Sequence, residues 1–176
     1  MTPPVEDPAR PTGQAEIPAE ALAHWIEPRL EPAFELNGVL EPAVLIGETP
    51  QGTRRMVPIT GGTFAGAGIR GTVLGGGADW QFVRSDGVAE LHALYLLQTD
   101  DGARIQVENH GLRHGPPQVM QRLAAGEPVD PSQYYFRAAP RFFAPLGRYD
   151  WLNRSLFVCS GLRSPLGIRL WIYRIG

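Results

Sequence analysis

Hydrophobic and polar residues alternate in short runs along most of the chain, and the runs are separated by glycine, proline or aspartate. Because successive side chains of a strand point to opposite faces, this alternation predicts β-strands. Asp100-Asp101-Gly102 is a strong hairpin signal between two such runs. Strands are expected over residues 33–40, 43–49, 54–59, 69–74, 80–84, 88–99, 104–110, 134–143, 156–162 and 168–175.

The short spacing of these runs predicts an all-β protein, a closed antiparallel β-barrel of about 8–10 strands that encloses a small-molecule cavity. It argues against parallel βαβ units, which need long crossover helices. One or two short helices are expected, the first over Pro116–Gly126, where prolines precede and glycine follows an apolar stripe, and a second over Pro18–Trp25. Residues 1–20, rich in Pro, Glu and Ala, predict a flexible N-terminal arm, and residues 21–176 a single domain.

Composition narrows the function classes. The 176 residues are 43% hydrophobic and carry a formal net charge of -2, which gives no electrostatic footprint for nucleic acid. All sixteen basic residues are arginines, so a Schiff-base lysine is excluded. No apolar run approaches the roughly 20 residues that span a bilayer, and the first residues lack the apolar core of a secretory signal. We therefore expect a cytoplasmic protein with no membrane partner.

Three features resemble nucleotide-binding, metal-binding or catalytic motifs, but each is better explained by a structural role. We therefore expect neither a cofactor nor a metal. Gly66–Gly71 matches the dinucleotide fingerprint, but the β-favouring residues that follow it predict a barrel corner and not a helix. His110 and His114 are four residues apart, yet the glycine and prolines around them disfavour a helix, so a loop role is expected. Cys159 lies in an apolar run, as a buried thiol that acts as a small hydrophobe.

Alternation also assigns residues to faces. In the run 88–99, His92 and Leu94 share one face, and Leu91 and Tyr95 share the other. Both faces are mainly apolar near the middle, so one can line the barrel interior while the other packs against the helix or a partner subunit.

The order of several short motifs resembles the DUF3237 family, also called UPF0311, from about Arg29 to the C-terminus. The motifs are Val57-Pro58-Ile59-Thr60-Gly61-Gly62-Thr63-Phe64, Gly71-Thr72-Val73-Leu74, Gly76-Gly77-Ala78-Asp79-Trp80, Thr99-Asp100-Asp101-Gly102, Asn109-His110-Gly111-Leu112-Arg113-His114-Gly115, Tyr135-Phe136-Arg137 and Trp151-Leu152-Asn153. The resemblance implies a compact antiparallel barrel with an internal cavity. Some members in natural-product pathways are associated with cofactor-free ring closure, in which a hydroxyl group adds across an alkene.

The chain departs from the family pattern in two places. Where the family usually has Asp-Ala-Arg-Tyr, this chain has His92-Ala93-Leu94-Tyr95, and where it has Phe-Glu-Thr, this chain has Phe142-Phe143-Ala144. We expect a cavity wall that has lost charge and accepts a more apolar ligand than the family norm.

The leading hypothesis is a cofactor-independent cyclase or isomerase that acts on an apolar, polyketide-like intermediate inside the barrel. His92 is the candidate general acid or base, because imidazole exchanges a proton near neutral pH. Arg137 and Tyr135 are expected to polarise a carbonyl or stabilise an enolate. The residues expected to bind the substrate are Trp80, Leu94, Asn109, Phe143 and Trp151.

Two alternatives from other classes remain open. A non-catalytic carrier or sensor of a small hydrophobic ligand would use the same kind of cavity. A structural role through the outer barrel face would be favoured by a filled interior. A homodimer is a further expectation.

Overall fold

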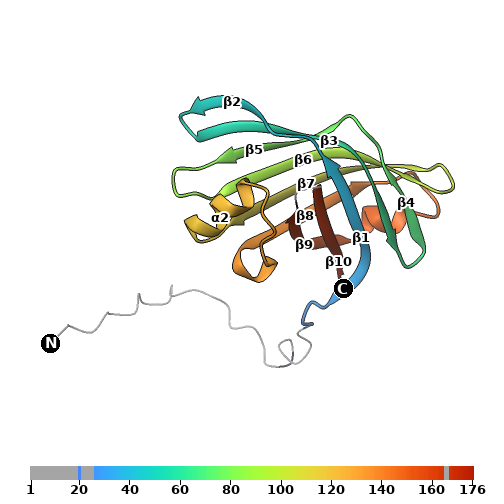
Figure 1. Ribbon diagram of the computed structural model, residues 1–176. Coiled ribbons are helices and arrows are strands. Elements are labelled where there is room, and N and C mark those ends of the chain that lie inside the picture. Colours follow the sequence, from blue (N-terminus) through green and yellow to red (C-terminus); the bar gives the residue numbers. More distant parts are fainter. Residues whose placement is uncertain (1–19, 21–25, 165–166) are drawn as a thin grey trace.

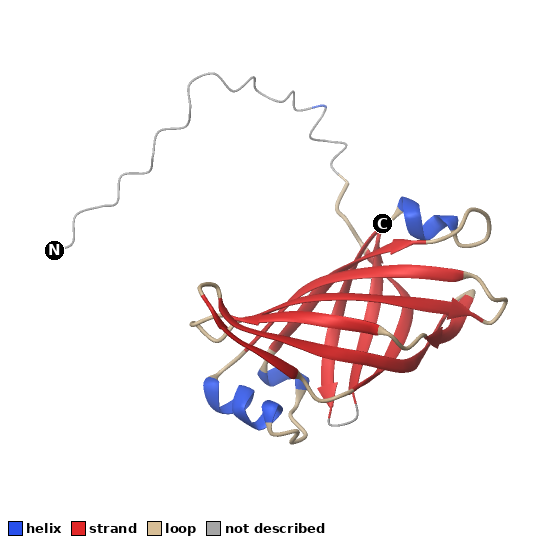
Figure 2. Ribbon diagram, turned by 90° about the horizontal axis from the view of Figure 1, so that it is seen from above, coloured by secondary structure: helices blue, strands red, loops and turns tan. Residues whose placement is uncertain are grey.

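The computed structural model describes residues 20, 26–164 and 167–176, and its strands wrap around a common axis (Figures 1 and 2). The predicted arm (1–20) and helix (Pro18–Trp25) lie, apart from Glu20, outside the described residues. The strands are β1 (Leu30–Leu40), β2 (Val44–Thr49), β3 (Gly52–Gly66), β4 (Ile69–Val73), β5 (Gly77–Val83), β6 (Ala89–Thr99), β7 (Arg104–His114), β8 (Tyr135–Phe143), β9 (Leu156–Ser164) and β10 (Gly167–Ile175). The helical elements are α2 (Pro117–Ala124) and the 3-10 turns η1 (Pro131–Gln133) and η2 (Asp150–Arg154).

The sheet closes into an antiparallel barrel because β1 pairs with both β10 and β3. From β10 the order continues through β9, β8, β7 and β6. Strands β4 and β5 then share the place between β6 and β3, with β4 at one end of β3 and β5 at the other. The predicted all-β barrel and the helix after β7 are confirmed. No helix in the described part of the chain is long and apolar enough to cross a membrane.

Several strands differ in extent from their predicted ranges, and the differences are largest at the C-terminal ends of β3 and β7. The third strand, expected to end at Ile59, continues through the glycine-rich stretch to Gly66, because glycine lets the backbone bend at a register shift opposite β1. The seventh strand, expected to end at His110, reaches His114. His110 and His114 therefore lie on a strand and not in a loop.

Aromatic side chains fill one end of the barrel, which we call the closed end. Phe34 packs against Phe64 and Phe142, and Phe142 packs against Phe157, with ring centroids 4.9–5.7 Å apart. Leu97 beside them is fully buried. Burial of such large side chains is the main favourable contribution to folding, so this end supplies the rigid base of the barrel.

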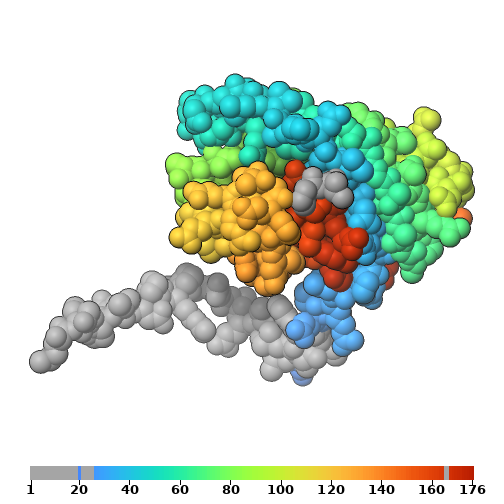
Figure 3. Space-filling view, in the orientation of Figure 1, coloured from blue at the N-terminus to red at the C-terminus, as the bar shows by residue number. Residues whose placement is uncertain are grey.

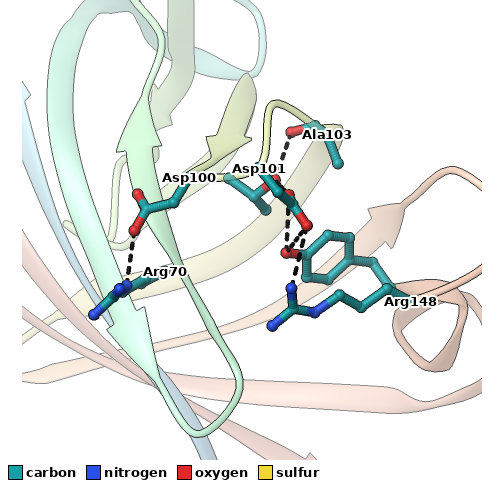
Figure 4. A network of polar contacts seen from close by, with 7 residues as sticks. Arg70, Asp100, Asp101, Ala103 and Arg148 are labelled. Atoms are coloured by element: carbon teal, nitrogen blue, oxygen red, sulfur yellow. Dashed lines mark hydrogen bonds and ion pairs between the residues drawn. The ribbon is translucent and has the colours of Figure 1, made fainter.

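Polar contacts fasten the β6–β7 hairpin at the closed end (Figure 4). Arg70 donates to Asp100 over 2.7 Å. Asp101 accepts hydrogen bonds from the hydroxyl groups of Thr99 and Tyr149, and Arg148 lies 3.3 Å away. These contacts join the hairpin to the segment that precedes η2.

The other end of the barrel is flanked by α2 and by the β2–β3 hairpin (Figure 3). Pro117 starts the helix, and Gly126 follows it with φ +80°, so the segment begins and ends as predicted. Leu123 and Met120 of α2 face the barrel interior. The helix therefore covers this end instead of plugging the barrel.

Candidate functional site

A cavity of about 540 Å³ lies inside the barrel between the aromatic base and α2. Ligand sites for small organic molecules measure about 300–1,000 Å³, so the volume fits such a ligand. Most of the wall is apolar, and its larger members are Leu36, Val57, Ile59, Leu91, Phe136 and Leu170.

Five of the polar side chains that project from the strands into this cavity form what we call the polar cluster: Arg55, Asp79, Gln81, Arg113 and Arg163. They come from β3, β5, β7 and β9. Asp79 and Gln81 occupy alternate positions of β5, and Trp80 between them points outward. Strand pairing thus gathers charges that are as many as 108 residues apart in the sequence.

A chain of hydrogen bonds orders part of the cluster. Gln81 lies directly opposite Arg55 in the β3–β5 register. Its Oε1 accepts a hydrogen bond from Arg55 Nε over 2.9 Å, and its Nε2 donates to Asp79 Oδ2. The other carboxyl oxygen of Asp79 accepts from the backbone N–H of His92 over 3.0 Å. Both oxygens of Asp79 are therefore held in place.

Burial dominates the electrostatics of this site. It raises the pKa of Asp79, and the hydrogen bond from Gln81 and the charges of Arg113 and Arg55 oppose this rise without cancelling it. Burial, and after it the positive charge of Arg55, lowers the pKa of Arg113 to about 10. A carboxyl group with a raised pKa is suited to accept and return a proton during a reaction.

Three buried polar atoms in the described part of the chain have no hydrogen-bond partner, and all three belong to cavity-lining residues: Tyr95 Oη, Asn109 Oδ1 and Arg113 Nε. Burial raises the pKa of Tyr95, so its hydroxyl stays protonated and can donate. The amide of Asn109 donates a long contact of 4.0 Å to Cys159 Sγ. Such unpaired groups are costly in a protein interior unless a ligand engages them.

The predicted catalytic residues do not meet in this cavity. His92, Arg137 and Tyr135 all lie on the outer face of the barrel. His92 stacks on His110 with ring centroids 4.0 Å apart, and the guanidinium of Arg137 lies over the Tyr135 ring at 5.4 Å. The placement of His92 in the cavity, on which its predicted role depends, is wrong.

Of the predicted substrate-binding residues, Asn109 alone lines the cavity. Trp80, Leu94 and Phe143 point outward, and each is at least 39% exposed. Trp151 lies in η2, where it packs against Phe157 at the closed end.

The error has a physical cause in the pattern of β6. Both faces of this strand are apolar near its middle, so alternation fixes which residues share a face but not which face is inside. The structure turns Leu91 and Tyr95 inward, and His92 and Leu94 outward. The departures from the family pattern at His92, Leu94 and Phe143 therefore change the outer surface, and the prediction that they make the cavity more apolar is wrong.

Sequence reasoning missed the side chains of the polar cluster, although Asp79 and Arg113 stand within motifs that carry the family resemblance. A usable signal was the charged residue on an otherwise apolar face. Arg113 shares its face of β7 with Ile105 and Val107, which are fully buried. Within the described residues no group of three or more His, Cys, Asp or Glu is arranged to hold a metal ion.

Comparisons with known proteins agree with this architecture. The model of a family described as a protein of unknown function (DUF3237) matches residues 28–175. A UPF0311 protein of Rhodopseudomonas palustris (strain TIE-1) is 45% identical over 130 residues, which is 74% of this chain and 85% of that protein. A UPF0311 protein of Clostridium acetobutylicum is 39% identical over 150 residues, 85% of this chain and 95% of that protein. The crystal structure of a conserved protein of unknown function from Rhodopseudomonas palustris superposes with a TM-score of 0.81 at 38% identity, covering 86% of this chain and 99% of that one.

A similarity to an enzyme is more distant. A hydroalkoxylation enzyme of Penicillium herquei is 38% identical over 80 residues, which is 46% of this chain and 53% of that protein. The crystal structure of an enzyme from the same organism shares the fold, with a TM-score of 0.65 at 24% identity over 87% of this chain and 98% of that one.

Proposed function

Because the chain belongs to the DUF3237 family and its barrel encloses a largely apolar cavity with one polar side, we propose that it is a cofactor-independent cyclase. In this proposal a small, largely apolar metabolite undergoes ring closure when its hydroxyl group adds across an alkene. The observation that carries the proposal is the carboxyl group of Asp79, which lines the cavity with both oxygens fixed and with a raised pKa.

Asp79 moves the proton in this reaction. Its carboxylate takes the proton of the substrate hydroxyl while the hydroxyl oxygen bonds to the far carbon of an alkene conjugated to a carbonyl. The π electrons move to the carbonyl oxygen and give an enolate, and the carboxylic acid then returns the proton to the α carbon. One O–H bond and one C=C π bond are exchanged for one C–O and one C–H bond, so substrate and product are isomers and nothing else is consumed.

Arg113 and Tyr95 supply hydrogen-bond donors that stabilise the negatively charged oxygen of the enolate. Both line the cavity, and each has a buried donor atom without a protein acceptor among the described residues. Donors that already point at the developing oxyanion stabilise it without reorganisation. The apolar wall contributes by holding a flexible substrate in a folded shape, which brings hydroxyl and alkene together.

The similarity to a hydroalkoxylation enzyme of Penicillium herquei supports the reaction type, since hydroalkoxylation adds an alcohol or phenol oxygen across an alkene. That similarity covers 46% of this chain, so the substrate of that enzyme is not transferred to this one. The proposal keeps the predicted ring-closing chemistry and assigns it to Asp79 in place of His92.

The test uses a panel of hydroxy-alkenes that close rings by the same addition, including 2′-hydroxychalcone, whose closure to flavanone is followed by its loss of absorbance. We expect the protein to accelerate closure and to give an excess of one enantiomer. Asp79→Asn is expected to slow this step at least about 100-fold, the usual contribution of a general acid–base group. Asp100→Asn, the same substitution on the exposed hairpin at the closed end, is the matched control and is expected to leave the rate unchanged.

A carrier would behave differently in the same experiment. It would bind members of the panel inside the cavity, seen by native mass spectrometry, while each compound closed at its rate in buffer. Binding without acceleration or enantiomeric excess across the panel would contradict the cyclase and favour the carrier.

A further inference from the structure

The cavity contains more positive charge than the protein around it neutralises. Among the described residues that line it, the charged side chains are Arg55, Arg113, Arg163 and Asp79. Even with Asp79 ionised, two positive charges are left over. A buried excess of charge is unfavourable unless an ion of opposite sign accompanies it.

The cavity arginines lack the ion-pair partners that many surface arginines have, although the exposed Arg104, Arg137 and Arg141 also form no ion pair within the described residues. Seven arginines of the described residues form ion pairs, all of them partly or well exposed: Arg70, Arg84, Arg122, Arg148, Arg154, Arg169 and Arg174. Within the same part of the chain, no ion pair involves Arg55, Arg113 or Arg163. Asp79 does not neutralise them by direct contact, because its oxygens are engaged by Gln81 and by the backbone of His92.

Arg113 is the clearest case of a cation with unused donors. Its side chain is buried, its guanidinium lies 5.8 Å from the centre of the Phe136 ring, and its Nε has no acceptor in the described structure. Arg163 donates one hydrogen bond, from Nη1 to the carbonyl oxygen of Gly167 over 3.1 Å. The charges of Arg55 and Arg163 both lower the pKa of Arg113, as expected when like charges face one another.

We propose that the substrate of this cavity binds as an anion, an aromatic or conjugated acid whose carboxylate or phenolate oxygen is held by Arg113 and Arg163. A guanidinium presents a planar fork of donors that matches such an oxygen group, and the pairing gains strength away from water. The apolar remainder of the molecule packs against the wall formed by residues such as Leu91 and Leu170. This inference rests on the proposed function in that it takes the cavity as the site of the reaction.

Binding of three probes to the full chain, measured by calorimetry, tests the inference. 2-Naphthoate and its neutral isostere 2-naphthamide share one apolar body and differ in charge. We expect 2-naphthoate to bind at least about tenfold more tightly, which corresponds to about 1.4 kcal/mol. The third probe, 4-nitrophenol, changes its absorbance when it ionises, and we expect it to ionise at lower pH when bound than when free.

The variants Arg113→Gln and Arg163→Gln identify the groups responsible. Each is expected to reduce the preference for 2-naphthoate to about threefold or less, and to leave binding of 2-naphthamide unchanged. Arg141→Gln is the matched control, because Arg141 lies on the outer face over Phe143. Arg163 is only partly buried, so its variant tests the inference even if Arg113→Gln does not fold, which circular dichroism would show.

The outcomes separate this inference from the cyclase. Preference for 2-naphthoate alone assigns a carboxylate, and a shifted ionisation of 4-nitrophenol assigns a phenolate; either supports an anionic substrate. Equal or tighter binding of 2-naphthamide together with an unshifted ionisation of 4-nitrophenol, or no binding of any probe, overturns the inference. If the protein closes rings but shows no preference for the anion, the cyclase proposal holds and this inference fails. If it prefers the anion but closes no ring, the cavity binds anions and the cyclase proposal fails.

Discussion

The backbone N–H of His92 donates a hydrogen bond to Oδ1 of Asp79 over 3.0 Å, while the imidazole of His92 lies on the opposite, outer side of the barrel wall. The two residues belong to paired strands, β6 and β5, and the contact reaches from the main chain of one to the side chain of the other. The peptide group of His92 therefore supports the candidate acid–base group, and its side chain does not.

Replacement of the His92 side chain is accordingly expected to have small effects. His92→Gln keeps the backbone donor to Asp79 and removes the stack on His110, so we expect the free energy of unfolding to fall by no more than about 1 kcal/mol. Ring closure of 2′-hydroxychalcone, measured on the same samples, is expected to stay at the wild-type rate. A large loss of rate with an unchanged stability would show that the imidazole acts in the reaction and would contradict the assignment to Asp79.

The fold was more predictable than the site for a reason visible in particular residues. Hairpin signals such as Asp100-Asp101-Gly102 act locally, and the structure places a turn there with Gly102 at φ +87°. The pairing of β1 with β3 closes the barrel, which leaves no open edge between these strands, as is common in folds built from many short antiparallel strands. These features need little knowledge of which residues face inward.

Prediction of the site, in contrast, required knowing which residues of each strand face inward. Leu91 and Leu94 are equally apolar, yet the first is buried and the second is 45% exposed. A shift of one residue exchanges the two faces of a strand. Because β6 also carries apolar residues on its outer face, its sequence did not show which face lines the cavity. Arg55 and Gln81 are 26 residues apart in the sequence and lie opposite each other only because β3 pairs with β5 in this register. The sequence pattern does not predict this pairing.

Gln81 is expected to be important for stability because it links two charged groups. Gln81→Leu would leave Arg55 Nε and Asp79 Oδ2 without their shared partner inside the barrel. Loss of a partner for buried polar groups costs about 1–3 kcal/mol, so we expect a decrease of that size in the free energy of unfolding measured with urea. Gln98→Leu is the control, since Gln98 makes no side-chain hydrogen bond within the described structure; equal effects of the two variants would contradict the role of the link.

Asp79 gives a pH dependence of stability with a definite sign. Burial raises its pKa in the folded state above the ordinary value of 3.8, so the folded protein favours the protonated form. The stability that this group contributes is full below pH 3.8 and is lost as the pH rises through the raised pKa. We expect the wild type to lose stability relative to Asp79→Asn over that range, in urea denaturation at a series of pH values. The rate of ring closure is expected to rise over the same pH range, because the carboxylate of Asp79 forms there. If the wild type instead gained stability relative to Asp79→Asn as the pH rises, the arginines would lower the pKa of Asp79, which would contradict the prediction.

Asp101 provides the opposite case at the closed end of the barrel. The hydrogen bond from Thr99, and then that from Tyr149, hold the pKa of its carboxyl group below the ordinary value. A lowered pKa in the folded state means that the contribution to stability is present at neutral pH and is lost as the pH falls through that pKa. Tyr149→Phe removes the two contacts from the phenol oxygen, at 3.0 and 3.1 Å, while it keeps the buried ring.

We therefore expect Tyr149→Phe to lower the melting temperature by about 2–4 °C at pH 7 and by less in strong acid, where Asp101 is protonated in both proteins. Scanning calorimetry at pH 7 and at progressively lower pH measures the difference. Tyr173→Phe is the control, because Tyr173 lines a groove outside the barrel interior, beside Leu30 and Tyr135, and its hydroxyl makes no hydrogen bond within the described residues. A difference between wild type and Tyr149→Phe that stays constant with pH would mean that the hydroxyl stabilises the fold independently of the charge on Asp101, and the hairpin would then be held by packing and not by its carboxylate.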